Sequence, residues 1–171
     1  MAGAIANAKP HFSSDEIAEI YFEAARQGRT DILEGLLDAG APIDARDRKG
    51  YSALILAAYH NHIETVAFLA ARGADPCAGD RKGNTAQMGV AFKGHDDMAR
   101  LLIGYGCDAN LENNSGQTAV MMAALFGRTE QVKMLRAAGA DVEKRDLLGN
   151  SARLLARLQG NAEMIGLLQG R

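Results

Sequence analysis

The sequence predicts an all-α repeat solenoid, in which one short helical unit is stacked on copies of itself. Four glycines, Gly50, Gly83, Gly116 and Gly149, follow one another at a constant spacing of 33 residues. The residues after them recur as well, since Ser-Ala-Leu-Ile-Leu-Ala-Ala in one copy corresponds to Thr-Ala-Val-Met-Met-Ala-Ala in another. A fixed period of this length is typical of repeat architectures. We therefore expect about five units with short β-hairpin tips.

Each unit is predicted to hold two helices and an extended turn. The first helix begins after a Ser or Thr, whose hydroxyl can accept a hydrogen bond from a free backbone N–H. These N-cap residues are Ser52, Thr85, Thr118 and Ser151. The second helix carries apolar residues at helical spacing, as in Val66 and Leu69. It ends at a glycine, which tolerates positive φ, at Gly73, Gly106 and Gly139.

The domain organisation follows from this period. We expect residues 1–12 to be a flexible N-terminal tail and residues 13–171 to form one repeat domain. Its first unit begins at Ser13, with Glu16 three residues later as in a capping box. The expected units are 13–46, which caps the N-terminal end, 47–79, 80–112, 113–145, and 146–171, which caps the C-terminal end.

The composition excludes several classes of partner. The chain of 171 residues is 47% hydrophobic but only 5% aromatic, which fits a thin core of Ala and Leu between closely stacked helices. Its formal net charge of −2 gives no reason to expect nucleic acid or an anionic membrane as a partner. No stretch has the apolar length of a transmembrane helix.

From about Asp15 to the C-terminus, the chain resembles the ankyrin-repeat proteins. The family motif G-x-T-P-L-H-x-A-A is matched at Gly50, Ser52, Leu54, Ala57 and Ala58 in one copy and at Gly116, Thr118, Ala123 and Ala124 in another. The proline of the motif is replaced by Ala53, Ala86 and Ala119, and the histidine by Ile55, Met88 and Met121. This variant, G-x-T-A-L-x-x-A-A, is similar to bacterial members of the family.

The resemblance implies a non-enzymatic module that binds a protein partner through its hairpin tips and the concave face of its first helices. The candidate residues at the tips are Arg46, Arg48, Lys49, Tyr51, Arg81, Lys82, Asn84, Glu112 and Gln117. Those on the concave face are Tyr59, His60, Phe92, Lys93, Leu125 and Phe126. The implied roles include an inhibitor, an immunity protein against a toxic enzyme, or a helper of an enzyme.

The three large rings on the concave face, Tyr59, Phe92 and Phe126, are expected to lie close together. An exposed apolar patch of this kind favours the centre of a protein interface. The alternative is that the rings cover the seam between repeats as ordinary packing.

The first two tips are basic, and two interpretations stay open. Arg46, Arg48, Lys49, Arg81 and Lys82 could form a rim that steers an acidic partner. The alternative is a solvated turn surface, in which Asp47 and Asp80 are structural and partly neutralise the basic side chains.

The sequence offers no catalytic constellation, and we expect neither a cofactor nor a metal. His60 and His62 could be taken for metal ligands, but a metal needs more convergent donors than this pair. The resemblance implies that His62 and His95 serve packing and hydrogen bonding between the helices. Two rival hypotheses remain: a small-ligand or catalytic groove around Tyr59, His60 and Lys93, and a self-associating structural array. We expect a monomer.

Cys77 and Cys107 are the two cysteines of the chain. They belong to no CxxC pair, and they occupy different places in successive repeats, so that a disulfide would need a favourable geometry. The expectation is two reduced small hydrophobic residues in the cytoplasm. A periplasmic location is the alternative, because Ala6-Asn-Ala8 resembles the end of a signal-peptide cleavage site.

Overall fold

The computed structural model describes residues 13–169, which form ten helices. The expected tail at residues 1–12 lies outside the described residues. The helices are α1 (Ser14–Gln27), α2 (Thr30–Asp38), α3 (Ala53–Tyr59), α4 (Ile63–Ala71), α5 (Ala86–Lys93), α6 (Asp96–Gly104), α7 (Ala119–Leu125), α8 (Thr129–Ala137), α9 (Ala152–Gln159) and α10 (Ala162–Gln169).

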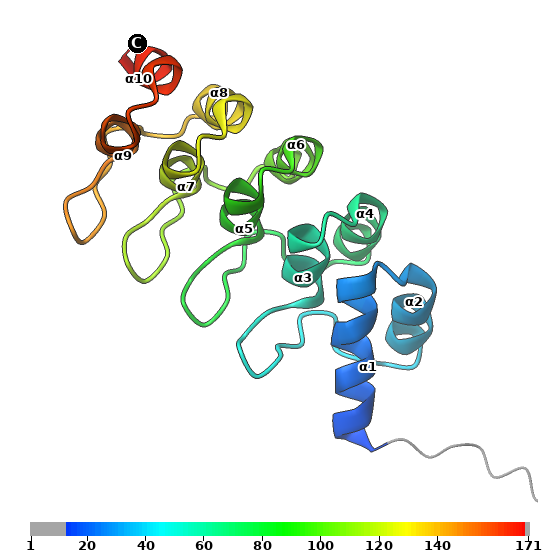
Figure 1. Cartoon of the computed structure of the whole chain (residues 1–171). Coiled ribbons are helices and arrows are strands. Elements are labelled where there is room, and N and C mark those ends of the chain that lie inside the picture. Colours follow the sequence, from blue (N-terminus) through cyan, green and yellow to red (C-terminus); the bar gives the residue numbers. More distant parts are fainter. Residues whose placement is uncertain (1–12, 170–171) are drawn as a thin grey trace, which may run out of the picture.

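The helices form two parallel rows, which confirms the predicted all-α solenoid (Figure 1). The odd-numbered helices make an inner row, and long loops project from the side of this row (Figure 1). No residue between 13 and 169 lies in a β-strand, so the tips are hairpin-shaped loops rather than paired strands.

The core lies between neighbouring units. Each inner helix packs against the next one in the row, from α1 to α9. Ala57, Ala58, Ala123 and Ala124 are fully buried in these contacts. Because small side chains let helix axes approach closely, the Ala-rich inner row stacks tightly. The outer helices close the core with larger side chains such as Leu69.

The predicted helix caps are present with one exception. Ser13 and Glu16 form the expected capping box at the start of α1. The hydroxyls of Ser52, Thr85 and Ser151 each accept the backbone N–H three residues later. Thr118 has an extended N-cap backbone, but its side chain makes no capping bond, and its buried hydroxyl has no hydrogen-bond partner.

One residue in each hairpin loop holds the turn closed. The side-chain oxygen of Asp47 accepts the backbone N–H groups of Lys49 and Tyr51, at 2.8 and 2.9 Å. The same pair of bonds recurs in the other three hairpin loops, where the acceptors are Asp80, Asn113 and Asp146. These Asp and Asn side chains are therefore part of the turn architecture.

The expectation of two reduced cysteines is wrong. Cys77 and Cys107 form a disulfide, with their Cα atoms 5.5 Å apart. The residues occupy different places in successive repeats, but stacking brings the end of one unit against the start of the next loop. Cys77 has the same repeat position as Asp44 and Asn110, whose side chains reach into the following unit.

None of the helices within residues 13–169 combines the length and the apolar character needed to cross a membrane.

The glycine that follows α6 offers a test of this fold. Gly106 has φ +75°, and an added Cβ would meet no atom within 4 Å, so that the cost of a side chain arises from the backbone alone. Gly106→Val is expected to lower the free energy of unfolding by about 1–2 kcal/mol. The matched control is Gly104→Ala, at the end of the same helix, where an added Cβ also has open space. Equal melting temperatures for Gly106→Val and the wild type in thermal denaturation would contradict this placement.

Candidate binding groove

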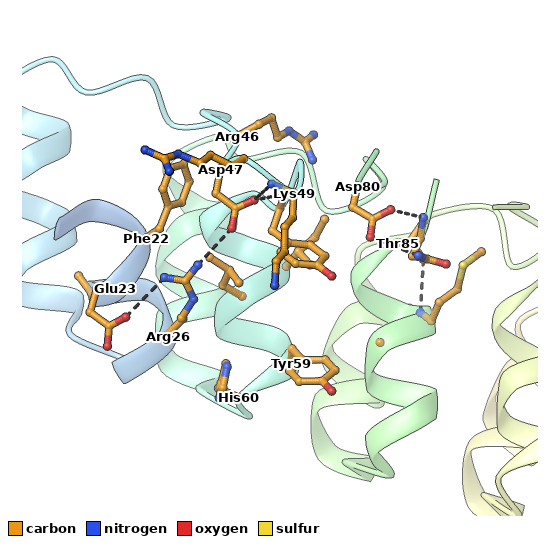
Figure 2. A pocket seen from close by; sticks show the side chains of 18 of the residues that line it. Phe22, Glu23, Arg26, Arg46, Asp47, Lys49, Tyr59, His60, Asp80 and Thr85 are labelled. Carbon is orange, nitrogen blue, oxygen red and sulfur yellow. Dashed lines mark hydrogen bonds and ion pairs between the residues drawn. The ribbon is translucent and has the colours of Figure 1, made fainter. Parts of the chain in front are cut away.

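The inner helices and the hairpin loops enclose a groove of about 1390 Å³ (Figure 2). It extends along the inner row from α1 to α7. Its apolar lining includes Phe22, Tyr51, Ile55, Tyr59, Met88, Phe92, Met122, Leu125 and Phe126. Its charged lining includes Asp15, Glu19, Glu23, Arg26, Arg46, Asp47, Arg48, Lys49 and Asp80.

The three predicted rings form a continuous row in this groove. Tyr59 and Phe92 lie nearly parallel, with their ring centroids 6.4 Å apart, and Phe126 meets Phe92 edge-on at 4.7 Å. Tyr59 and Phe92 occupy the same position in successive repeats, which is why stacking brings them side by side. Phe92 and Phe126 remain 43% and 39% exposed. The expected proximity is confirmed, and we call these three residues the aromatic row.

His60 and Lys93 adjoin the aromatic row. The Nζ atom of Lys93 lies 5.0 Å from the centre of the Tyr59 ring, which is a cation–π distance. The His60 ring lies 5.5 Å from the Tyr59 ring. Partial burial lowers the pKa of His60, and electrostatic interactions with its neighbours, including Lys93 and Arg26, lower it further.

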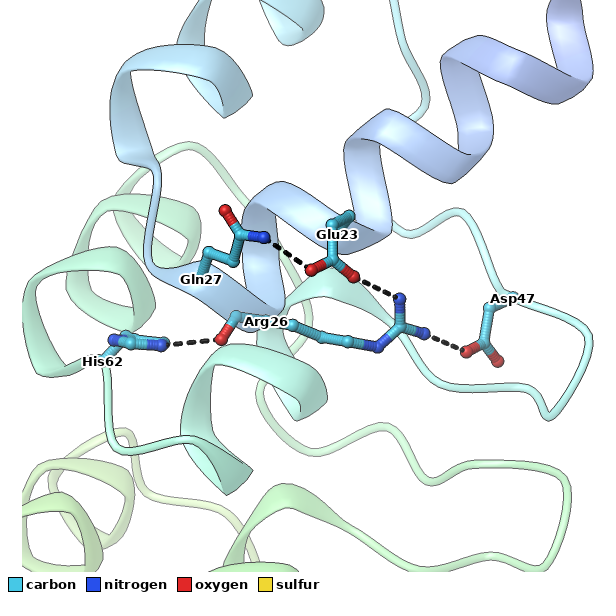
Figure 3. Close-up of polar contacts among 5 residues, drawn as sticks. All are labelled: Glu23, Arg26, Gln27, Asp47 and His62. Atoms are coloured by element: carbon cyan, nitrogen blue, oxygen red, sulfur yellow. Dashed lines mark hydrogen bonds and ion pairs between the residues drawn. The ribbon is translucent and has the colours of Figure 1, made fainter.

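A recurring bond fixes the ends of the inner helices. His62 Nε2 lies 2.8 Å from the carbonyl oxygen of Arg26 (Figure 3). Two repeats later, at the equivalent position, Arg128 donates to the carbonyl of Phe92 at 3.0 Å. The expected hydrogen-bonding role of His62 is thus confirmed. Arg26 and Phe92 line the groove, so these bonds fix the backbone of two groove residues.

Arg26 links α1 to the first hairpin loop. Its guanidinium donates to Glu23 at 3.4 Å and to Asp47 at 3.1 Å (Figure 3). Phe22, which also lines the groove, was not among the residues predicted for the site. The repeat register gives the signal, since Phe22 precedes Ile55 by one period, as Arg26 precedes Tyr59.

The predicted tip residues fall into two groups. Arg46, Arg48, Lys49, Tyr51, Asn84 and Gln117 line the groove, whereas Arg81, Lys82 and Glu112 lie outside its lining. Two of these side chains bond to other residues of the chain. Arg46 donates to the carbonyls of Gly50 and Gly79, and Glu112 forms an ion pair with Lys144 at 3.1 Å.

The remaining basic side chains at the tips have no such role. Within residues 13–169, the side chains of Arg48, Lys49, Arg81 and Lys82 make no hydrogen bond or ion pair. Asp47 and Asp80, by contrast, accept hydrogen bonds from their own loops. Within the described residues, the first two tips therefore carry cationic side chains that have no internal partner.

Neither histidine near the groove is arranged as a metal ligand. The His60 and His62 rings are 6.4 Å apart, and His62 Nε2 contacts a backbone carbonyl. In the described part of the chain, no group of three or more His, Cys, Asp or Glu side chains could hold a metal ion.

The two depressed histidine pKa values predict a pH dependence of stability. Partial burial is the largest cause of the lowered pKa of both His60 and His95. The positive charge of Lys93 lowers both pKa values further. Both histidines have a lower pKa in the folded protein than in the unfolded chain. Below about pH 6.5, the ordinary histidine pKa, the unfolded chain therefore binds more protons than the folded protein. Stability should therefore be complete above that pH and decrease as the pH falls below it.

Chemical denaturation at pH 7.5 and pH 5.0 measures this loss. In the His60→Gln and His95→Gln double variant, the difference between the two pH values should be smaller than in the wild type. An unchanged difference would show that these histidines do not contribute.

Comparison with known proteins agrees with this geometry. A family model described as ankyrin repeats (3 copies) matches residues 6–80 and 73–146. An ankyrin repeat protein of Pseudomonas aeruginosa is 45% identical over 53 residues, which are 31% of each chain. The human ankyrin repeat domain-containing protein 29 is 42% identical over 60 residues, or 34% of this chain and 20% of the relative. The bovine mitochondrial disaggregase is 43% identical over 54 residues, or 32% of this chain and 8% of the relative.

These alignments cover at most about a third of each of these relatives. The family model, however, matches well over half of this chain. The protein therefore belongs to the ankyrin-repeat family.

Proposed function

We propose that this protein is a non-enzymatic module that binds one protein partner in the concave groove and on the first hairpin tips. The observation that carries the proposal is the aromatic row, in which Phe92 and Phe126 are exposed and Tyr59 is partly buried. Large aromatic side chains dominate the energetics of protein interfaces, because they bury much apolar area when a partner covers them.

The groove also has the rigidity that binding requires. The bonds of His62 and Arg128 fix the carbonyl ends of α1 and α5. Arg26 joins α1 to the loop that carries Asp47. A surface held in this way loses little conformational freedom when a partner docks, which favours affinity.

The charges at the tips support an acidic partner surface. Arg48, Lys49, Arg81 and Lys82 lie at successive hairpin tips with no internal partner, whereas the neighbouring aspartates are engaged in turns. Such a basic rim accelerates encounter with an acidic protein. A nucleic acid is disfavoured, because Asp15 and Glu19 line the same groove and the chain as a whole is slightly acidic.

Within this proposal, residues 13–171 act as one array, and the protein alone is a monomer. An inhibitor, an immunity protein or a helper of an enzyme would each use the same surface. In each case, the partner would be a folded protein with an apolar anchor surrounded by carboxylates.

A small-ligand or catalytic groove is the second candidate, and one observation favours it. Tyr59, His60 and Lys93 do lie together at the groove. The contact of Lys93 is with the face of the Tyr59 ring, however, and Lys93 is not part of the groove lining. This arrangement supports a binding surface more than a proton-transfer site.

The aromatic row gives the first test. The double variant Phe92→Ala and Phe126→Ala should weaken partner binding by about 30-fold or more, the loss expected for an interface hot spot of about 2 kcal/mol. Both side chains are partly exposed, so circular dichroism and the melting temperature should change little. The binding measurement is calorimetry with a partner identified by cross-linking.

The control for this variant is Ile63→Ala, which removes a similarly exposed apolar side chain (38%) at the start of the outer helix α4. It should leave affinity unchanged. Equal binding by the wild type and the double variant would exclude the aromatic row from the interface.

The basic tips give the second test. Arg48→Glu combined with Lys49→Glu should slow association with the same partner, most strongly at low salt, because electrostatic steering is screened by ions. Stopped-flow kinetics at several salt concentrations measure the effect. The matched control compares Arg48→Glu alone with Arg100→Glu, which changes the net charge by the same amount at an exposed side chain on the outer helix α6. If both variants slow association equally, net charge rather than the tips is responsible.

A further inference from the structure

The Cys77–Cys107 disulfide takes the place of a hydrogen bond that recurs at the neighbouring junctions. At the preceding junction, Asp44 Oδ1 accepts the backbone N–H of Asp75 at 3.1 Å. At the following one, Asn110 Oδ1 accepts the backbone N–H of Asp141 at 2.7 Å. Asp44, Cys77 and Asn110 occupy one repeat position, so each unit reaches the next from the same point.

The second cysteine also departs from its repeat position. Ala41, Ala74 and Ala140 stand where Cys107 stands. Exchanging the two cysteines for Asn and Ala would therefore recreate the type of junction found on the Asn110 side. Asn110 spans that junction with hydrogen bonds alone, accepting from the Asp141 N–H and donating from its Nδ2 to the Gly139 carbonyl at 3.0 Å. The array can therefore hold together without a covalent bond at this position.

The surroundings of the disulfide favour its opening. Both cysteines are partly exposed, which gives a reductant access. They share a cavity of about 30 Å³ with Gln87. The side-chain oxygen and nitrogen of Gln87 are both buried without a hydrogen-bond partner. A disulfide cannot donate a hydrogen bond, whereas a thiol is a weak donor and acceptor. Reduction would thus place suitable partners in the cavity that Gln87 lines.

We propose that Cys77–Cys107 is a reversible redox site, opened by a dithiol reductant. A thiolate of the reductant attacks one sulfur, forming a mixed disulfide and releasing the other cysteine as a thiolate, which takes up a proton. The second thiolate of the reductant then attacks the reductant's own sulfur in the mixed disulfide. The two reductant sulfurs form a disulfide, and the remaining cysteine leaves as a thiolate that also takes up a proton. Two electrons and two protons enter the protein, and the reductant leaves as a disulfide.

Opening the bridge loosens one joint of the array. The junction between the α3–α4 and α5–α6 pairs then has neither the covalent bond nor the polar contact of its neighbours. The helix packing between α3 and α5 remains. The groove crosses this joint, because Tyr59 on α3 stacks on Phe92 on α5. An effect on partner affinity rests on the proposed function, whereas the loosening itself does not.

The experiment compares three forms of the full chain without a partner: oxidised, reduced with dithiothreitol under native conditions, and the variant Cys77→Asn with Cys107→Ala. Alkylation and mass spectrometry count the thiols, circular dichroism follows the helices, and hydrogen exchange follows residues 74–79 and 106–111. We expect two thiols in a protein that keeps its helical signal, with severalfold faster exchange in these two segments.

The Asn and Ala variant is the matched control. It should exchange more slowly than the reduced protein in both segments and should not respond to dithiothreitol. Three outcomes would overturn the proposal: thiols that become available only after denaturation, loss of the helical signal on reduction, or equal exchange in the oxidised and reduced forms. A failure to find a partner affects none of these measurements.

Discussion

The structure depends on the burial of apolar side chains between adjacent helical pairs. The Ala-rich faces of α3, α5 and α7 pack against the neighbouring inner helices, and the outer helices close the same core. No unit has a core of its own, so stability is the sum of contacts between nearest neighbours. The same constraint leaves one side of the inner row uncovered, and that side becomes the groove.

Stacking at a fixed period also repeats the polar contacts. A side chain that reaches the next unit from one position can do so again at the equivalent position of a later repeat, as Asp44 and, two periods on, Asn110 show. The functional candidates are the positions where this repetition breaks. At the groove-facing position of Arg26, later repeats have Tyr59 and Phe92. At the tip positions of Arg48 and Lys49, the last repeat has Leu147 and Leu148. At one junction, a disulfide replaces the hydrogen bond.

Much of this could be predicted from the sequence, because periodicity and capping are local properties. The spacing of Gly50 and its equivalents predicted the helical pairs, and the position of Tyr59 and Phe92 predicted their contact. The disulfide was not predicted, because the two cysteines occupy different repeat positions and only the stacking of successive units brings them together. The unpaired hydroxyl of Thr118 and the ion pairs of Arg26 depend on side-chain conformations, which no sequence pattern specifies.

Small-angle X-ray scattering tests the central claim most directly. A compact globule of this length has a radius of gyration of about 16 Å. Units that bury their apolar sides only against their neighbours must instead form an elongated array, with a clearly larger radius and an asymmetric distribution of interatomic distances. A symmetric distribution with a radius near the globular value would contradict the account.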